Sequence, residues 1–190
     1  MSYYKDNAKD YISKTINVNM EDSYAFFLKY AKPKTKLIDI GFGSGRDMIY
    51  FKSIGFDVYG IDTEYKFVEE AQKKGLSVSC SDIIIDFSDS FDVYDCIWAC
   101  ASLHHIPKEL LNLTFKICSN ILKTGGIMYC SFKYGDFVGF LHGRYFHFMT
   151  EKTIVNYIKD TNLTIIDVKI TNDNLNRDTK WLNVILRKGE

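Results

Sequence analysis

Long apolar runs are missing from the sequence, which has 190 residues. No stretch reaches the roughly 18 consecutive apolar residues that a transmembrane helix requires, so no membrane span is predicted. Residues 1–6 are mostly polar, include an acid, and lack the apolar segment of a signal peptide. Together these absences predict a cytoplasmic protein without a membrane partner.

An excess of charge of either sign is also missing. The sequence has 24 Lys and Arg residues and 24 Asp and Glu residues, so its formal net charge is zero. Proteins that bind nucleic acid neutralise phosphates with basic residues, and this balance gives no general electrostatic footprint for such a partner. We therefore do not expect nucleic acid as a partner, although a local basic patch is compatible with zero net charge.

Prolines and cysteines are few, and no two cysteines have the C-x-x-C spacing. An odd number of cysteines inside apolar runs is typical of buried, reduced thiols in a cytosolic protein. Zinc binding is the alternative, but the four histidines stand at no familiar ligand spacing from the cysteines, so no metal site is predicted. The cysteines are Cys80, Cys96, Cys100, Cys118 and Cys130.

What the sequence does contain is typical of one globular domain. Hydrophobic residues make up 46% and charged residues 25% of the chain, proportions that exclude a disordered or fibrous protein. A chain of this length buries about 70% of the surface that its unfolded form exposes, so it folds without disulfides or metal. We expect a single domain over residues 1–190.

Strand and helix signals alternate along the chain, which is typical of a parallel sheet covered by helices on both faces. Short apolar strands are predicted at residues 36–40, 57–61, 76–80, 94–99, 127–132, 164–170 and 181–187. Helices are predicted within 3–30, at 44–55 and 64–74, after Pro107 and near Thr150. The last two strands follow each other without a helix and form a terminal hairpin. The expected fold is a Rossmann-like α/β domain with seven strands.

The first predicted strand ends in Gly41-Phe42-Gly43-Ser44-Gly45 and leads into a helix. Glycines at this position let the backbone bend sharply and let a ligand approach without interference from a Cβ atom. The third glycine comes one residue earlier than in the G-x-G-x-x-G fingerprint of dinucleotide-binding enzymes, where Arg46 stands instead. A nicotinamide-dependent dehydrogenase and a plain tight turn are the alternatives at this point.

Two aspartates follow later strands of the same predicted sheet. Asp62 ends the second strand, where its carboxylate can accept hydrogen bonds from both hydroxyls of a ribose; a helix cap is the alternative. Asp82 follows the third strand, where it can accept a hydrogen bond from an adenine amino group beside the Ile83 amide; a turn aspartate is the alternative. Because open α/β sheets bind ligands at the carboxyl ends of their strands, a nucleoside with its tail over the glycine loop is predicted.

These motifs together resemble those of the class I S-adenosylmethionine-dependent methyltransferases. The resemblance is carried by Asp39-Ile40-Gly41-Phe42-Gly43-Ser44-Gly45, Asp62, Ser81-Asp82 and Leu122-Lys123-Thr124-Gly125-Gly126. It implies a seven-stranded, mostly parallel sheet of order 3-2-1-4-5-7-6 with strand 7 antiparallel, and S-adenosylmethionine as the cofactor. Residues 35–133 would form the cofactor-binding core, residues 1–34 a helical lid, and residues 134–190 the acceptor-pocket segment with the terminal hairpin.

The resemblance also implies where the cofactor binds. The glycine-loop backbone would hold the methionine portion, Asp62 the ribose, and Asp82 with Ile83 the adenine. The expected cofactor-binding residues are Tyr11, Asp39, Gly41, Gly43, Gly45, Arg46, Asp62, Thr63, Asp82, Ile83, Cys100 and Ala101, the last two beside the sulfonium. Phe42 departs from the family pattern, which has a small residue there, and would narrow the methionine pocket unless its side chain points to the helix.

Three residues are candidates for work on the acceptor. His104 and His105 follow the fourth strand, next to the expected position of the methyl group, and a histidine can take a proton from a hydroxyl, amine or thiol. Arg144 lies between the fifth strand and the next helix, where its guanidinium can hold a carboxylate or phosphate. Structural roles for the histidines and a surface position for Arg144 are the alternatives.

Arg46-Asp47 and Leu103-His104-His105 are similar to the small-molecule branch of the family, which includes the tellurite-resistance and ubiquinone-biosynthesis types. The expected function is methyl transfer from S-adenosylmethionine to a small-molecule acceptor by in-line displacement, in a monomer or weak homodimer. A tRNA wobble-nucleotide methyltransferase is one alternative, because some of these enzymes share the double histidine. A non-catalytic S-adenosylmethionine-binding protein is the other. Base-amino methylation is not supported, because residues 99–102 lack the Asn/Asp-Pro-Pro-aromatic tetrad.

Overall fold

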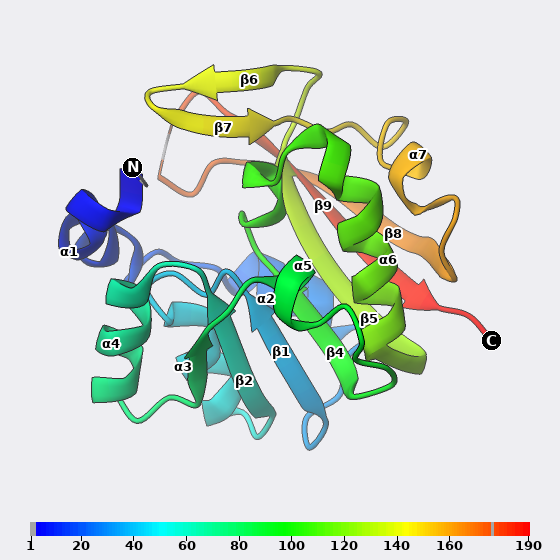
Figure 1. Cartoon of the computed structure of the whole chain (residues 1–190), viewed down its shortest axis with the longest axis horizontal. Helices are drawn as coiled ribbons and strands as arrows, with labels where there is room; N and C mark the ends of the chain where they lie inside the picture. The colour runs from blue at the N-terminus through cyan, green and yellow to red at the C-terminus, as the bar shows by residue number, and fades with distance from the viewer. Residues whose placement is uncertain (1–2, 176) are drawn as a thin grey trace.

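A computed structural model describes residues 3–175 and 177–190, with the side chains described from residue 7 onward. Within these residues, a seven-stranded sheet lies between two layers of helices (Figure 1). A separate two-stranded hairpin lies beyond one end of the sheet.

The sheet has the strand order β3-β2-β1-β4-β5-β9-β8. Strands β1 to β5 run parallel, and β9 runs antiparallel to both of its neighbours. Since β8 and β9 are the sixth and seventh strands of this sheet, the expected Rossmann-like order is confirmed. The strands are β1 Lys36–Ile40, β2 Asp57–Asp62, β3 Val78–Cys80, β4 Tyr94–Ala99, β5 Leu122–Lys133, β8 Leu163–Asn172 and β9 Lys180–Lys188.

Helices cover both faces of the sheet, and each face has its own hydrophobic core. Residues of α6 and α7 pack into one core, and residues of α1 to α4 pack into the other. Figure 1 shows α6 in front of β4 and β5, with α2 and α3 behind the sheet. The helices are α1 Tyr3–Thr15, α2 Glu21–Leu28, α3 Arg46–Ser53, α4 Tyr65–Lys73, α5 Ile83–Asp86, α6 Leu111–Ile121 and α7 Val155–Ile158.

Neighbouring residues of the central strands belong to opposite cores. In β1, Leu37 packs against α2 and α3, whereas Ile38 belongs to the core under α6. In β4 the same division separates Trp98 from Ile97. Successive side chains of a strand point to opposite faces, and a sheet buried on both faces therefore requires continuous apolar runs. This explains why the central strands are mostly apolar, with Asp39 as the buried exception in β1.

The hairpin of β6 (Val138–Leu141) and β7 (Arg144–His147) was not expected, because residues 134–148 read only as a glycine- and aromatic-rich segment. Its two-residue turn is His142-Gly143, and both residues have positive φ, 50° and 75°. Two left-handed residues are what the tight I′ turn of a β-hairpin requires. The helix expected to begin near Thr150 begins later, since the α-helix there is Val155–Ile158.

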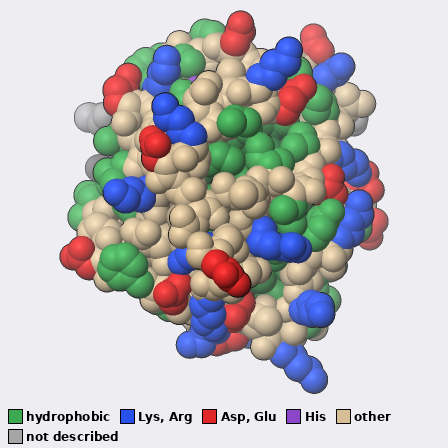
Figure 2. Space-filling model, turned by 90° about the vertical axis from the view of Figure 1, so that its right-hand side faces the viewer, with side chains coloured by type: hydrophobic (Ala, Val, Ile, Leu, Met, Phe, Trp, Pro, Cys, Tyr) green, Lys and Arg blue, Asp and Glu red, His purple; other side chains and the backbone are tan. Residues whose placement is uncertain are grey.

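None of the described helices is both long and apolar enough to cross a membrane. Figure 2 views the molecule from the side of α7 and the C-terminus, and acidic and basic side chains are interspersed on that face. The five cysteines are all free. Cys96, Cys118 and Cys130 are buried as predicted, whereas Cys100 is only partly buried and Cys80 is exposed.

A buried carboxylate, Asp47, connects the N-terminal helices to the sheet. It accepts hydrogen bonds from the Tyr24 hydroxyl (2.6 Å) and the Trp98 indole N–H (2.9 Å). It also forms a two-pronged ion pair with Arg46, at 2.7 and 2.9 Å. Burial alone would raise the pKa of Asp47, but the Arg46 charge and these hydrogen bonds lower it. Arg46 in turn donates a hydrogen bond to the Thr15 carbonyl at the end of α1.

We expect Asp47→Ala to lower the free energy of unfolding by about 3–5 kcal/mol, because it leaves the Arg46 charge buried without its partner. Tyr24→Phe removes one hydrogen bond and should cost about 1.5 kcal/mol. The exposed pair of Asp10 and Lys14 provides the control, and Asp10→Asn should change stability by less than about 0.5 kcal/mol. Urea unfolding followed by circular dichroism measures all three, and equal losses for Asp47→Ala and Asp10→Asn would contradict the assignment.

Candidate functional site

The glycine loop runs from Gly41 to Gly45, between β1 and α3. Gly41 and Gly43 have φ of +73° and +53°, in the left-handed region that favours glycine. A Cβ atom on Gly41 would lie 2.5 Å from Cβ of Ser102, and one on Gly43 would lie 3.1 Å from Cε1 of Tyr11. Ser102 and Tyr11 therefore pack directly against the loop backbone, and a side chain at either glycine would crowd them.

Asp62, the last residue of β2, holds the glycine loop and the start of α4 at the same time. Its Oδ2 accepts a hydrogen bond from the Gly43 amide (3.0 Å), and its Oδ1 accepts one from the Glu64 amide (2.9 Å). Burial raises the pKa of Asp62 to about 6, although both amide hydrogen bonds oppose the shift. One oxygen thus holds the glycine loop and the other holds the amide of Glu64, the residue before α4, whereas α4 has no side-chain cap of the kind considered as the alternative for Asp62.

Asp82, two residues after β3, also contacts two parts of the structure. Its Oδ1 accepts hydrogen bonds from the amides of Ile84 (2.7 Å) and Ile85 (3.4 Å), so that it caps the short helix α5. The side chain also lines a cavity with an empty volume of about 1040 Å³, open mouth included. The cap fixes the direction of the carboxylate relative to this cavity.

We call this space the glycine-loop cavity, because it lies over the ends of β1 to β4 beside the loop. Its lining includes eight of the twelve expected cofactor-binding residues: Tyr11, Gly41, Gly43, Asp62, Thr63, Asp82, Ile83 and Ala101. The other four, Asp39, Gly45, Arg46 and Cys100, lie outside it. The carboxylates of Asp62 and Asp82 can accept hydrogen bonds from hydroxyl and amino groups, and apolar lining residues such as Ile61 and Ile83 can contact a flat ring.

Two buried polar atoms in and below this region have no hydrogen-bond partner among the described residues: Oγ of Ser102 and Oδ2 of Asp39. Ser102 lines the glycine-loop cavity, whereas Asp39 is buried in β1 beneath the loop. Burial and the nearby Asp47 charge raise the pKa of Asp39 well above its usual range, against the effect of Arg46. A buried polar atom without a partner is costly, and a bound ligand is one way to satisfy it. The cradle and its unsatisfied Ser102 hydroxyl therefore fit an adenosyl cofactor.

Phe42 does not narrow the glycine-loop cavity. Its side chain is 6% exposed and packs among the aromatic residues between α3 and the sheet. A Cβ atom on Gly60 would lie 2.9 Å from Cδ1 of Phe42, which shows how closely the phenyl ring is enclosed. The expected departure from the family pattern is thus accommodated by the neighbouring glycine.

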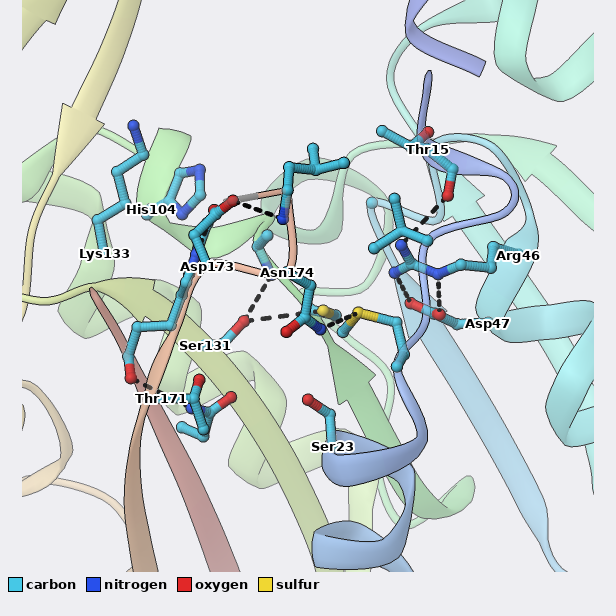
Figure 3. A pocket seen from close by; sticks show the side chains of 18 of the residues that line it. Thr15, Ser23, Arg46, Asp47, His104, Ser131, Lys133, Thr171, Asp173 and Asn174 are labelled. Atoms are coloured by element: carbon cyan, nitrogen blue, oxygen red, sulfur yellow. Dashed lines mark hydrogen bonds and ion pairs between the residues drawn. The ribbon is translucent and has the colours of Figure 1, made fainter. Parts of the chain in front are cut away.

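A second space, which we call the hairpin cavity, lies between α1, the ends of β4 and β5, and the β6–β7 hairpin (Figure 3). Its empty volume is about 1020 Å³, open mouth included. The expected catalytic residues His104, His105 and Arg144 all line it, as do Arg46 and Cys100. The two cavities share Tyr11, Gly41, Ala101 and His105. The two cavities therefore adjoin each other at these four residues.

The two histidines form a pair at the end of β4, with 3.1 Å between their Nε2 atoms. Burial lowers the pKa of His105 to about 4 and that of His104 well below its usual value, so both rings are neutral near pH 7. Nδ1 of His105 lies 2.7 Å from the carbonyl oxygen of Tyr145 and must donate to it. A neutral imidazole has one proton, so Nε2 of His105 accepts the proton of His104 Nε2.

This assignment of tautomers leaves Nδ1 of His104 without a proton. That atom is buried and has no hydrogen-bond partner among the described residues. A bare imidazole nitrogen beside a cavity can accept a proton or a hydrogen bond from a ligand. His105 and the Tyr145 carbonyl thus fix which nitrogen of His104 can act as a base.

Cys100 is not a nucleophile in this arrangement, because burial raises the pKa of its thiol to about 12. The hydroxyl of Ser131 donates to Cys100 (3.8 Å) and accepts a hydrogen bond from the Ala101 amide (2.8 Å). These contacts fix the backbone where the two cavities meet. In the described part of the chain, no group of three or more His, Cys, Asp or Glu side chains could hold a metal ion.

Sequence reasoning missed Ser102 and Lys133. Ser102 follows β4 and faces the glycine loop, and Lys133 is the last residue of β5 and lines the hairpin cavity. Both stand at carboxyl ends of parallel strands, and this position was the available signal.

Comparisons with known proteins agree with this geometry. Residues 38–130 match the family described as Methyltransferase domain. The Burkholderia thailandensis 1,6-didemethyltoxoflavin-N1-methyltransferase, solved with 1,6-didemethyltoxoflavin and S-adenosylhomocysteine, superposes with a TM-score of 0.79 at 19% identity. That match covers 98% of this chain and 84% of the other. A Methanosarcina mazei S-adenosylmethionine-dependent methyltransferase superposes with a TM-score of 0.76 at 18% identity, over 87% of this chain and 98% of the other.

A curated relative, an uncharacterized protein of Rickettsia prowazekii, is 26% identical over 106 residues. The match covers 52% of this chain and 19% of that protein, so the chain spans about a fifth of the length of the curated relative it matches. The region matched by the family contains the glycine loop, both aspartates and the histidine pair. Together with the observed strand order, the match over residues 38–130 supports assignment of the chain to the class I S-adenosylmethionine-dependent methyltransferases.

Proposed function

We propose that this methyltransferase transfers the methyl group of S-adenosylmethionine to a small molecule held in the hairpin cavity. The observation that carries the proposal is the meeting of the two cavities at Tyr11, Gly41, Ala101 and His105. In-line displacement requires donor and acceptor to lie in adjoining sites, with reacting atoms about 3–3.5 Å apart. Two cavities that share one wall meet this requirement.

In this proposal the cofactor lies in the glycine-loop cavity. The carboxylate of Asp62 binds the ribose hydroxyls, with Thr63 beside it, and Asp82 with the Ile83 amide binds the adenine. The backbone of Gly41 and Gly43 holds the methionine portion, under the ring of Tyr11. The close approach that these glycines permit supports this placement.

Four further residues act on the cofactor from outside this cavity. Asp39 lies beneath the loop, and Gly45, the residue before α3, is left-handed with φ of +77°. Arg46 is held by Asp47, and Cys100 stands next to Ala101 at the junction of the two cavities. Their proposed role is to position the loop and the sulfonium end of the cofactor rather than to bind the nucleoside.

The cofactor supplies a methyl group that its sulfonium has already activated, so the protein needs chiefly to align the acceptor and exclude water. The unprotonated Nδ1 of His104 accepts the acceptor's proton where one must leave. His105 and the Tyr145 carbonyl keep that nitrogen unprotonated, and Arg144 holds the acceptor from the hairpin. The in-line attack then occurs where the two cavities adjoin.

The shape of the hairpin cavity supports a small acceptor. Residues 1–34 act as the proposed lid, since Tyr11 and Thr15 of α1 line the cavity on one side. Residues 134–190 complete it on the other, through the hairpin and the start of β9. An empty volume of about 1020 Å³, enclosed by these segments, suits a compact ligand. The structurally similar Burkholderia thailandensis methyltransferase was solved with 1,6-didemethyltoxoflavin bound, which supports a small-molecule acceptor here.

Binding and turnover test the proposed function directly. We expect S-adenosylhomocysteine to raise the melting temperature and to bind in calorimetry, and NAD to do neither. Methyl groups from isotopically labelled S-adenosylmethionine should then appear in the small-molecule fraction of a cell extract. Label recovered in tRNA, or binding without any transfer, would contradict the proposal.

Asp62 makes cofactor binding depend on pH. Its raised pKa means that its ionisation destabilises the free protein as the pH rises through about 6, and the ribose hydroxyls favour this ionised form. We expect the Kd of S-adenosylhomocysteine to be nearly constant above pH 7 and to rise up to about tenfold per pH unit below 6.

The variant Asp62→Asn should bind about tenfold more weakly at pH 8 and lose this pH dependence, because it has no carboxyl proton to release. Asp57→Asn, at the exposed start of the same strand, is the matched control and should keep the wild-type profile. Calorimetric titrations between pH 5 and pH 8 measure both, and a parallel profile for Asp62→Asn and wild type would overturn the ribose assignment.

His104→Gln should lower kcat by about 100-fold on an acceptor that loses a proton, because the unprotonated Nδ1 is removed. The Kd of S-adenosylhomocysteine should stay within about threefold of wild type, since His104 lies outside the glycine-loop cavity. His142→Asn, in the exposed hairpin turn, is the control and should keep full activity. Unchanged kcat in His104→Gln with that acceptor would remove His104 as the base.

A further inference from the structure

The charges that line the hairpin cavity do not balance. Its described lining contains four cationic side chains and two carboxylates, so positive charge is in excess by two. These charged residues are Arg46, Lys133, Arg144 and Arg177, with Asp47 and Asp173. The chain as a whole has zero net charge, so this local excess is a property of the cavity.

Both carboxylates are already occupied by groups of the protein. Asp173 is 5% exposed and accepts hydrogen bonds from the Arg177 guanidinium (2.6 and 3.0 Å) and the Trp181 indole N–H (2.8 Å). Asp47 likewise accepts hydrogen bonds from Arg46, Tyr24 and Trp98. Lys133 and Arg144 are the other two cations of the lining.

Lys133 and Arg144 lie against the same aromatic ring. Nζ of Lys133 is 4.2 Å from the ring centre of Phe146, and Cζ of Arg144 is 5.0 Å from it. Lys133 takes part in none of the ion pairs found among the described residues. Burial, followed by the charges of Arg177 and Arg144, lowers the pKa of Lys133. Like charges held together in a partly desolvated place repel, and an anion between them relieves the repulsion.

The same place lies close to the proposed base. The His104 ring centre is 5.3 Å from that of Phe146 and 5.5 Å from that of Trp181. Figure 3 shows His104 and Lys133 on the same side of the cavity, across from the pair of Arg46 and Asp47. His104 is 2% exposed, and its Nδ1 has no partner among the described residues. A ligand that is held by the two cations would therefore have its remaining atoms beside a buried hydrogen-bond acceptor.

We propose that the methyl acceptor is a small anion whose carboxylate or phosphate group binds between Lys133 and Arg144. This inference rests on the proposed function and adds the chemical class of the acceptor to it. The aromatic side chains of Phe146 and Trp181 flank the site, so a planar ring attached to the anionic group suits the cavity. A guanidinium and an ammonium together offer the charged donors that such oxygens prefer.

Probes that pair an anion with a neutral analogue test the inference. The protein is first saturated with S-adenosylhomocysteine, and benzoate, benzamide, phenyl phosphate and phenol are then titrated by calorimetry. We expect benzoate or phenyl phosphate to bind at least about tenfold more tightly than its neutral counterpart. Comparison of the two anions then distinguishes a carboxylate acceptor from a phosphate acceptor.

Variants connect that preference to the proposed residues. Lys133→Gln should reduce the preference for the anion to less than about threefold, and Lys133→Arg should retain it. Lys159→Gln, an exposed lysine outside both cavities, is the control and should behave as wild type. The melting temperature and the affinity for S-adenosylhomocysteine report whether Lys133→Gln is still folded, and Arg144→Gln provides a second variant with the same expected loss.

The outcomes separate this inference from the function on which it rests. If S-adenosylhomocysteine binds but anionic and neutral probes bind equally, the anionic acceptor is wrong and the methyltransferase proposal stands. The same holds if the preference survives in both Lys133→Gln and Arg144→Gln. If S-adenosylhomocysteine itself does not bind, the proposed function fails, and the inference fails with it.

Discussion

The ion pair of Arg46 and Asp47 is the interaction on which the rest of the site depends. It is buried beneath the N-terminal helices, where Asp47 also accepts hydrogen bonds from Tyr24 of α2 and Trp98 of β4. Through Arg46 the same pair reaches the last turn of α1, at the Thr15 carbonyl. Because a buried charge must keep its partners, α1 and α2 are fixed on the sheet. The position of Tyr11, which stands in the wall shared by the two cavities, follows from this constraint.

The two cavities have opposite electrostatic character. Asp62, Glu64 and Asp82 line the glycine-loop cavity, which contains no lysine or arginine among its described lining residues. The hairpin cavity has an excess of cations, with its carboxylates held in ion pairs. A cationic sulfonium donor and an anionic acceptor would each enter the cavity of complementary charge. Their opposite charges would then also attract each other where the two cavities adjoin.

Sequence reasoning reached the fold and most of the expected cofactor cavity because both depend on local patterns. Alternating apolar strands and helices predicted the seven-stranded sheet, and the glycine loop with Asp62 and Asp82 stood at the strand ends that the fold brings together. The hairpin escaped prediction because its turn, His142-Gly143, lacks the usual Asn-Gly signal and depends on two left-handed residues. Its partner, the 3-10 helix η1 (Leu103–His105), is distant in sequence.

By itself, then, the sequence determined which backbone segments are strands, where the chain can approach a ligand closely, and which carboxylates stand at the carboxyl edge of the sheet. Only the tertiary structure decided the states of the side chains. Arg46 became half of a buried pair, His104 was left with an unprotonated Nδ1, and Lys133 was brought to the ring of Phe146. These outcomes depend on burial and on partners far apart along the chain, and a local pattern contains neither.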